Sequence, residues 1–237
     1  MADRPMLFSS PMVCALLEGR KAQTRRVLKL PGWAAKPPEF EEGEQGVAAI
    51  CAETGCFALL PTPQIGDRLW VKETWRVSPE ACEGWNPDDA RPTGWIDYRA
   101  RGSEERSAPN FDAVCRATFG KSGEIDWDCV PSDWRPSIFM PRWASRLTLN
   151  VTNVRVQRLN DCSEEDAIAE GIEARGVGCL WGWIDYLETN PNVTRHFADP
   201  RRSYASLWDH INGPGAWEAN PWVVALSFDV RKGNIDG

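Results

Sequence analysis

The order of apolar and polar residues near the start of the chain predicts a strand, a short helix and a cationic loop. Residues 5–8 are the apolar part of an entering strand. Four apolar residues within 12–17 recur at the spacing of one helical face. Ser10 is a suitable N-cap, Pro11 fits the first helical turn, and Gly19 suits a left-handed C-cap.

Several later stretches have the patterns of β-strands. Leu69 and Val71 alternate with polar neighbours after a Gly-Asp turn, which predicts a strand within 65–75. Residues 147–159 have the clearest alternation, and a phase break at Thr152-Asn153 indicates a bulge or bend. Further strands are expected at the end of the chain and, from weaker patterns, at other places: 222–230, 27–30, 95–100 and a hairpin of 47–51 with 56–60.

Two helices are predicted in the second half of the chain. Asp161 or Ser163 caps a short helix with an acidic first turn, which Gly171 ends. This places Glu170 at a helix C-terminus, where the helix dipole disfavours a carboxylate. A residue placed against its local preference is a candidate functional residue. A longer helix begins at Asp199-Pro200 and carries an apolar face.

The remaining stretches are rich in glycine and proline and are interpreted as irregular. They are 31–65, 76–133 and 176–192, and the tail after 230 is expected to fray. No internal repeat is present.

Composition restricts the classes of function. The 237 residues carry a net charge of -7, so any nucleic-acid binding must rest on a local cationic patch, and loose binding to DNA is disfavoured. No apolar run of membrane-spanning length and no signal segment are seen, so we expect a cytoplasmic protein with reduced thiols. Of eight cysteines, only Cys51 and Cys56 are close in sequence, and no metal or cofactor is expected.

Four cations follow the first helix within seven residues: Arg20, Lys21, Arg25 and Arg26. Cations at a helix C-terminus interact favourably with its dipole, which explains the first two. The last two lie beyond Gly19, and they fit an anion or nucleic-acid site equally well.

A second dense basic and aromatic cluster occupies 134–146. Its arginines alternate with Trp134, Phe139 and Trp143. Guanidinium groups bind phosphate or carboxylate, and aromatic rings stack on bases. The other interpretation is a surface loop packed by its rings and paired with nearby acids. The same choice between packing and stacking applies to each of the thirteen tryptophans.

Four ordered motifs make the chain resemble the ASCH domain family, particularly its phage and prophage members. The motifs are Gly-Arg-Lys-x-x-Thr-Arg-Arg at 19–26, Gly-Asp-Arg-Leu-Trp-Val at 66–71, Met-Pro-Arg-Trp-Ala-Ser-Arg at 140–146 and Asn-Gly-Pro-Gly-x-Trp at 212–217. The resemblance implies an α+β protein with a PUA-like fold, a small β-barrel surrounded by helices and carrying long irregular insertions. It implies one domain over 1–237, with insertions at about 31–64, 76–133 and 176–199.

The family's signature loop, Gly-x-Lys-x-x-Glu-x-Arg, is matched at Gly19, Lys21 and Arg26, but Thr24 stands at the glutamate position. This loop is similar to that of the bacterial N(4)-acetylcytidine amidohydrolases. That similarity implies catalytic roles for Lys21, Thr24 and Glu170, the last through Ala-Ile-Ala-Glu at 167–170. Lys21 would be the base, Thr24 the nucleophile or an orienter of water, and Glu170 a proton shuttle or a support for Lys21.

The expected partner is a nucleoside, a nucleotide or single-stranded RNA. Binding is assigned to nine residues: Arg20, Arg25, Arg26, Trp70, Glu73, Arg135, Arg142, Trp143 and Arg146. Two other functions stay open. One is a non-catalytic module for RNA or single-stranded nucleic acid, and the other is a phage accessory protein that binds a host partner. The sequence does not determine an oligomeric state.

Overall fold

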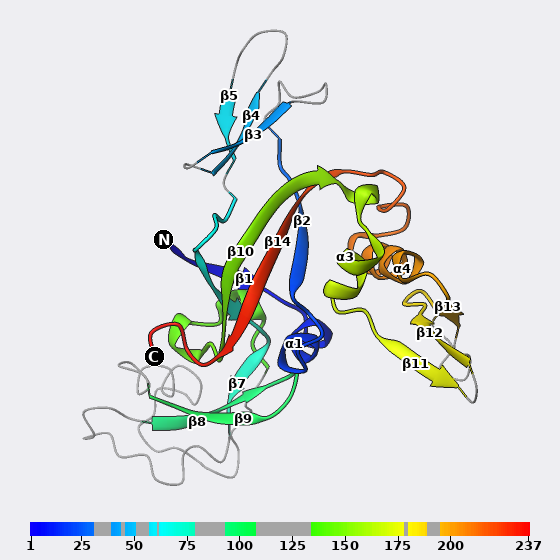
Figure 1. The fold of residues 1–237 in the computed structure, drawn as a ribbon. Coiled ribbons are helices and arrows are strands. Elements are labelled where there is room, and N and C mark those ends of the chain that lie inside the picture. Colours follow the sequence, from blue (N-terminus) through cyan, green and yellow to red (C-terminus); the bar gives the residue numbers. More distant parts are fainter. Residues whose placement is uncertain are drawn as a thin grey trace. The chain divides into compact units, whose positions relative to one another are not determined.

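The computed structural model describes residues 1–30, 39–43, 46–50, 57–60, 62–78, 93–107, 134–177, 180–188 and 195–237. These residues form a mixed α+β protein with many strands and few helices, which confirms the expected class (Figure 1). The chain divides into two compact units, each discontinuous in sequence. The first comprises 1–2, 18–67 and 150–230, and the second comprises 3–17, 68–149 and 231–237.

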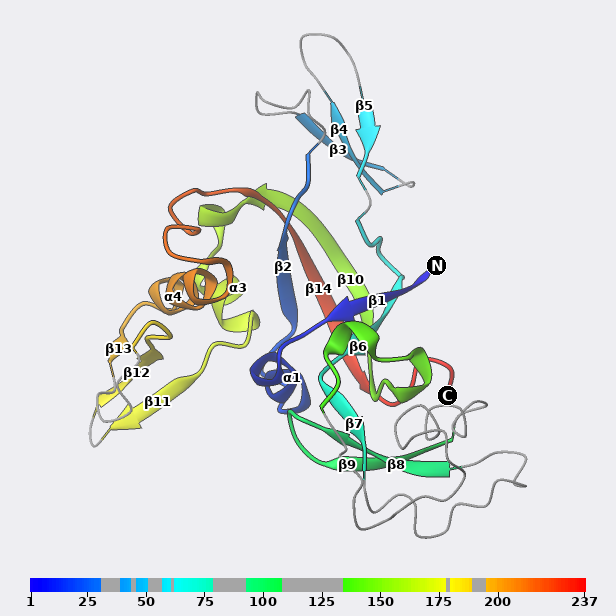
Figure 2. The same cartoon turned by 180° about the vertical axis from the view of Figure 1, so that it is seen from behind.

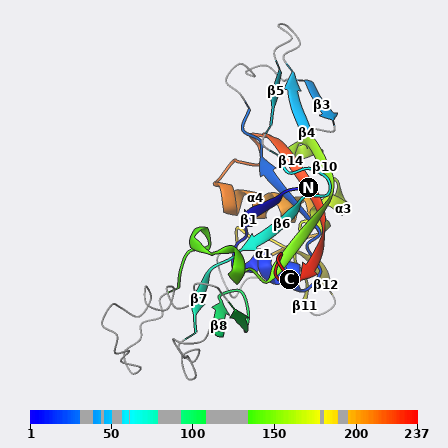
Figure 3. The same cartoon turned by 90° about the vertical axis from the view of Figure 1, so that its left-hand side faces the viewer.

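The largest sheet has the strand order β1-β6-β10-β14-β2. β10 (Leu147–Arg158) and β14 (Trp222–Lys232) lie side by side and pass through both units (Figures 1 and 3). Both strands were predicted. Within β10, the consecutive residues Thr152 and Asn153 are exposed, which is the break in alternation seen in the sequence. Among the described residues the strands form no closed barrel.

In the first unit, β2 (Gln23–Val27) pairs antiparallel with β14 (Figure 2). The expectation of a cationic loop at 20–26 with a strand from 27 is therefore wrong, because the strand begins four residues earlier. Hydrogen bonding to β14 draws this polar segment into the sheet, and Gln23, Thr24 and Arg25 are all buried.

The helices of the first unit are α3 (Glu164–Ala169) and α4 (Pro200–Asn212), which pack against each other. Ser163 caps α3 by accepting a hydrogen bond from the Asp166 N–H, and Asp199 caps α4. Tyr204 and Trp208 of α4 belong to the buried core, whereas Ile211 on the predicted apolar face is half exposed.

The first unit also contains two small sheets in stretches that were predicted to be irregular. The β11 (Ala174–Val177), β12 (Leu180–Ile184) and β13 (His196–Phe197) strands form one antiparallel sheet. The β3 (Glu39–Gly43), β4 (Gly46–Ile50) and β5 (Phe57–Leu59) strands form the other. The second sheet contains the expected hairpin and adds β3. Cys51 and Cys56 lie outside the described residues.

In the second unit, β1 (Asp3–Leu7) pairs parallel with β6 (Arg68–Lys72), and α1 (Ser10–Leu17) follows β1. Gly19 has φ +73°, as its C-cap position predicted. The β7 (Trp75–Val77), β8 (Thr93–Tyr98) and β9 (Ser103–Ser107) strands form an antiparallel sheet, of which only β8 was expected.

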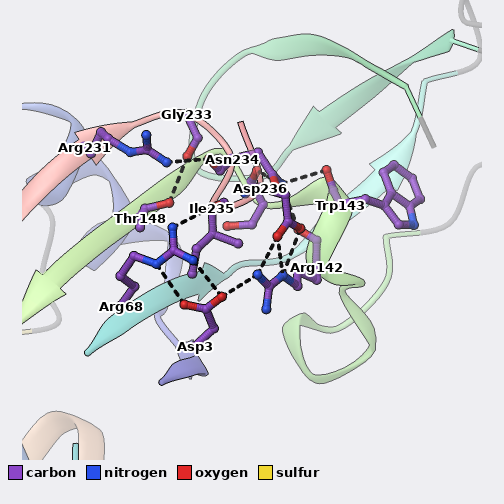
Figure 4. Close-up of polar contacts among 11 residues, drawn as sticks. Asp3, Arg68, Arg142, Trp143, Thr148, Arg231, Gly233, Asn234, Ile235 and Asp236 are labelled. Atoms are coloured by element: carbon purple, nitrogen blue, oxygen red, sulfur yellow. Dashed lines mark hydrogen bonds and ion pairs between the residues drawn. The ribbon is translucent and has the colours of Figure 1, made fainter. Parts of the chain in front are cut away.

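Residues 134–146 contain two short 3₁₀ helices, η3 (Ser137–Phe139) and η4 (Arg142–Ala144). The chain end is ordered against this segment, so the expectation of a frayed tail is wrong (Figure 4). The Asn234 amide donates hydrogen bonds to the carbonyl oxygens of Arg142, Trp143 and Ser145, and Ile235 is only 2% exposed. None of the described helices is long and apolar enough to cross a membrane.

Candidate active site

The C-terminus of α3 places Glu170 beside the segment that follows α1. Glu170 is the C-cap of α3, and Gly171 at φ +87° turns the chain away. An isolated antiparallel bridge joins Lys21 to Glu170, and the Ala22 N–H donates to the Ala169 carbonyl at 2.9 Å. The two predicted catalytic residues, 149 positions apart, are therefore neighbours through backbone pairing in one unit.

The Lys21 ammonium is buried against Glu170. Nζ donates to the Glu170 carboxylate at 2.8 Å and to the Glu170 carbonyl oxygen at 2.7 Å, and Lys21 is 1% exposed. Burial lowers the pKa of Lys21, an effect that the Glu170 carboxylate opposes and that Arg26 and Arg25 reinforce. Loss of solvation is the largest cause of this lowered pKa, and the two arginines contribute least.

Arg25 supplies a second cation to the same carboxylate. Its Nη1 lies 3.0 Å from Glu170 Oε1 and 2.8 Å from Gln23 Oε1. Its Nη2 forms an ion pair with Asp166 at 2.7 Å. Burial acts to raise the pKa of Asp166, but Arg155 at 2.8 Å and Arg25 together hold it below its ordinary value. Arg25 therefore stands between two carboxylates of α3 and its C-cap.

Tyr204 completes this arrangement from α4. Its ring centroid lies 5.9 Å from the Arg25 guanidinium, which also binds Glu170. Burial, followed by the nearby Glu170 charge, raises the pKa of Tyr204 well above its ordinary value, so the phenol stays protonated. We call Lys21, Arg25, Asp166, Glu170 and Tyr204 the Glu170 cluster.

Two members of the Glu170 cluster, Tyr204 and Asp166, were not predicted as site residues. Tyr204 was read only as part of an apolar helix face, and Asp166 only as a favourable charge in a first helical turn. A signal that could have identified Asp166 is its position four residues before Glu170, one helical turn away on the same face. The nearby Cys162 thiol is also buried, which raises its pKa to about 12.

Thr24 lies on β2 between Gln23 and Arg25, whose side chains are hydrogen bonded to each other. Because side chains alternate along a strand, Gln23 and Arg25 share one face and Thr24 and Arg26 share the other. Thr24 is 2% exposed, and among the described residues its hydroxyl makes no hydrogen bond to Lys21 or Glu170. Arg26 still acts electrostatically on Lys21 and Glu170.

Arg20 stands at the edge of this site. Its Nη1 donates to the Gly171 carbonyl oxygen at 2.7 Å, and its Nη2 pairs with Glu18 at 2.7 Å. The Arg20 side chain is 36% exposed, in contrast to buried Arg25. All six predicted residues within 20–26 and at 170 thus belong to the first unit.

The other six predicted residues belong to the second unit. Glu73 and Arg146 are buried and form a bidentate pair with distances of 2.8 and 3.0 Å. The Arg146 guanidinium also lies 4.0 Å from the Tyr98 ring centroid. Trp70 is 9% exposed, and the Lys72 ammonium lies 5.3 Å from its ring centroid.

Arg142 joins the N-terminal strand to the chain end within the second unit (Figure 4). Its guanidinium donates to Asp3 at 2.6 Å and to Asp236 at 2.9 Å, and Asp3 also pairs with Arg68. Hydrogen bonds from Arg68 and Arg142 lower the pKa of Asp3. These contacts tie three segments of the unit together, and binding of nucleic acid by Arg142 stays a prediction.

Two remaining predicted residues surround Trp75. The Arg135 guanidinium lies 5.2 Å from the Trp75 ring centroid, and Trp143 meets Trp75 edge to face with centroids 6.1 Å apart. Trp75 itself is 1% exposed. Trp143 therefore packs against a neighbouring ring, as expected if residues 134–146 are a surface segment packed by its aromatic residues.

No group of three or more potential metal ligands occurs among the described residues. The Glu170 cluster itself supplies a lysine, two carboxylates, an arginine and a phenol. Comparison with protein-family models, with curated proteins and with solved structures found no match to this chain.

Proposed function

We propose that the Glu170 cluster is the centre of a nucleoside-directed amidohydrolase that acts on an N(4)-acylated cytidine. The observation that carries the proposal is the buried pair of Lys21 and Glu170, with Nζ 2.8 Å from the carboxylate. The resemblance implied this pair from residues far apart in the chain. A PUA-like arrangement belongs to the same proposal, and a small β-rich fold is compatible with it.

In the proposed reaction, water adds to the acyl carbonyl and the exocyclic C–N bond breaks. The acyl group leaves as a carboxylic acid, and the cytidine amine takes the proton. Lys21 acts as the base in its neutral form, which its burial favours. Water is the nucleophile in this scheme, and Glu170 holds Lys21 through two hydrogen bonds. A direct role of Thr24, as nucleophile or as orienter of water, stays a prediction of the resemblance, because its side chain lies on the face of β2 opposite Arg25. Because all three residues are at most 5% exposed, substrate entry requires the covering side chains to move.

The test is release of cytidine from N(4)-acetylcytidine, followed by chromatography. Lys21→Ala and Glu170→Gln should each abolish turnover by the purified protein. Glu173→Gln is the matched control, because Glu173 is 40% exposed and its ion-pair partner is Arg175, which is itself 58% exposed. Absence of turnover by the wild type would contradict the proposal.

A second candidate function is the binding of single-stranded nucleic acid by the second unit. Three large apolar side chains around η3 are exposed: Trp134 at 37%, Ile138 at 61% and Phe139 at 70%. The Arg76 guanidinium lies 4.7 Å from the Trp134 ring centroid, so cation and ring occur together. Fluorescent RNA oligonucleotides test this function.

If the second function holds, Phe139→Ala should weaken oligonucleotide binding several-fold, since stacking on one aromatic side chain contributes about 1–3 kcal/mol. Leu187→Ala is the matched control, because Leu187 is equally a large exposed apolar residue, at 50%. Equal affinity of the wild type and Phe139→Ala would exclude this surface.

A further inference from the structure

The Glu170 cluster contains a second charge pair, formed by Arg25 and Asp166. Asp166 lies one helical turn before Glu170 in sequence, and both carboxylates are held by the same guanidinium. The side chain of Arg25 is fully buried, and that of Asp166 is 13% exposed. Arg25 therefore divides one positive charge between two acids.

This division couples Asp166 to Lys21 without direct contact. A stronger ion pair between Arg25 and Asp166 leaves Glu170 less neutralised, and Glu170 then stabilises the Lys21 ammonium more. A weaker pair lets Arg25 neutralise Glu170, which favours neutral Lys21. Because these groups are buried, their charges are poorly screened by solvent.

We infer that Asp166 and Arg25 are positioning residues that set the protonation of Lys21 from outside the catalytic pair. The inference rests on the proposed function for its role in turnover, since neutral Lys21 is the base of that reaction. It assigns Asp166, Arg25 and Arg155 a role that the resemblance did not imply.

Other titratable or charged groups also surround Lys21, and none of them is changed in the variants compared below. Arg26 on β2 disfavours protonation of Lys21, and Tyr204 on α4 carries no charge because its pKa is raised. The Cys162 thiol stays neutral. The groups from the packed elements are therefore Arg25 and Arg26 of β2, Asp166 and Glu170 of α3 and its C-cap, Tyr204 of α4, Cys162 after η5 (Leu159–Asp161), and Arg155 of β10.

The experiment measures the ionisation of Lys21 directly in the full chain. Lysine side chains labelled with ¹³C and ¹⁵N give a titration curve by NMR, and the Lys21 signal is the one missing from Lys21→Met. Asp166→Asn should move the Lys21 midpoint down by about 0.5 pH unit or more, and Arg25→Met should move it up by a similar amount. A merely structural role would not produce opposite shifts.

A surface variant keeps the test valid if Arg25→Met fails to fold. Arg155 is 41% exposed and pairs with Asp166, so Arg155→Gln should leave the fold intact. Without the Arg155 charge, Asp166 forms a stronger ion pair with Arg25, and the midpoint of the Lys21 titration should move to higher pH. Arg175→Gln is the matched control with no expected shift, because Arg175 is 58% exposed and pairs with Glu173.

The pH dependence of N(4)-acetylcytidine turnover should shift in the same directions. The midpoint of its acidic limb should move to lower pH in Asp166→Asn and to higher pH in Arg155→Gln. Shifts in the same direction, or an unmoved Lys21 midpoint, would overturn the inference. If the wild type shows no turnover but the midpoints move oppositely, the proposed reaction fails and the electrostatic coupling stands. The two failures are therefore distinguishable.

Discussion

Replacing Glu170 by glutamine tests how strongly one carboxylate holds the Glu170 cluster together. Lys21 and Arg25 both donate to Glu170, and the three side chains are at most 4% exposed. Glutamine keeps the size but leaves two buried cations poorly compensated, and breaking a buried ion pair costs about 3–5 kcal/mol. Lys21 can avoid being a buried unpaired charge by releasing its proton, so its contribution to this cost has an upper limit. Neutralising a lysine with an ordinary pKa of 10.5 at pH 7 costs about 4.8 kcal/mol, at 1.36 kcal/mol per pH unit.

The loss should depend on pH in a defined direction. Once Lys21 is neutral in the folded variant, the unfolded chain binds one more proton at every pH below 10.5, so stability rises with pH. The cost of Glu170→Gln should therefore shrink by up to about 2.7 kcal/mol between pH 7 and pH 9. Adding Lys21→Met should remove this pH dependence, because the titrating group is gone.

The assay is urea unfolding followed by tryptophan fluorescence at both pH values. The wild type, Glu170→Gln and the double variant are compared, with Glu173→Gln as the exposed control, which should change stability by less than about 0.5 kcal/mol. A cost below about 1 kcal/mol at pH 7, or the same cost at pH 7 and 9, would refute the buried ionic arrangement.

Two further predictions concern other parts of the structure. The folded Cys162 thiol keeps its proton up to a pKa of about 12, whereas the unfolded thiol ionises near 9.0, so stability is lost as pH rises above 9. Cys162→Ala should reduce the loss between pH 8 and pH 10 by about 1.3 kcal/mol in urea unfolding, and an unchanged loss would contradict the burial of this thiol. Asn234→Ala removes three hydrogen bonds to the 142–145 segment and should lower the free energy of unfolding by about 1–3 kcal/mol, whereas a frayed tail would give no change.

Local patterns predicted the elements whose signals are local. The alternation in β10, the Ser163 cap of α3 and the glycine turn after α1 depend on neighbouring residues, and the structure confirms them. The position of Glu170 against its helix dipole correctly marked it as unusual, because its partners come from another segment.

Elements whose stability comes from distant partners could not be predicted. Arg25 looked like a loop residue because buried arginines are rare, and its carboxylates lie at least 141 positions away, counting from 25 to 166. The β11–β12 hairpin was hidden by glycines, whose cost is offset by packing such as that of Trp181 on Gly176. The tail looked polar, yet Asn234 finds its carbonyl partners about 90 residues earlier in the chain.

The central claim is that the Glu170 cluster catalyses hydrolysis of an N(4)-acylated cytidine. The most direct measurement is the rate of cytidine release from N(4)-acetylcytidine by wild type and by Lys21→Ala, with the folding of both checked by circular dichroism. The account predicts turnover by the wild type and none by the folded variant. Equal rates for the two proteins, or no release by either, would contradict it.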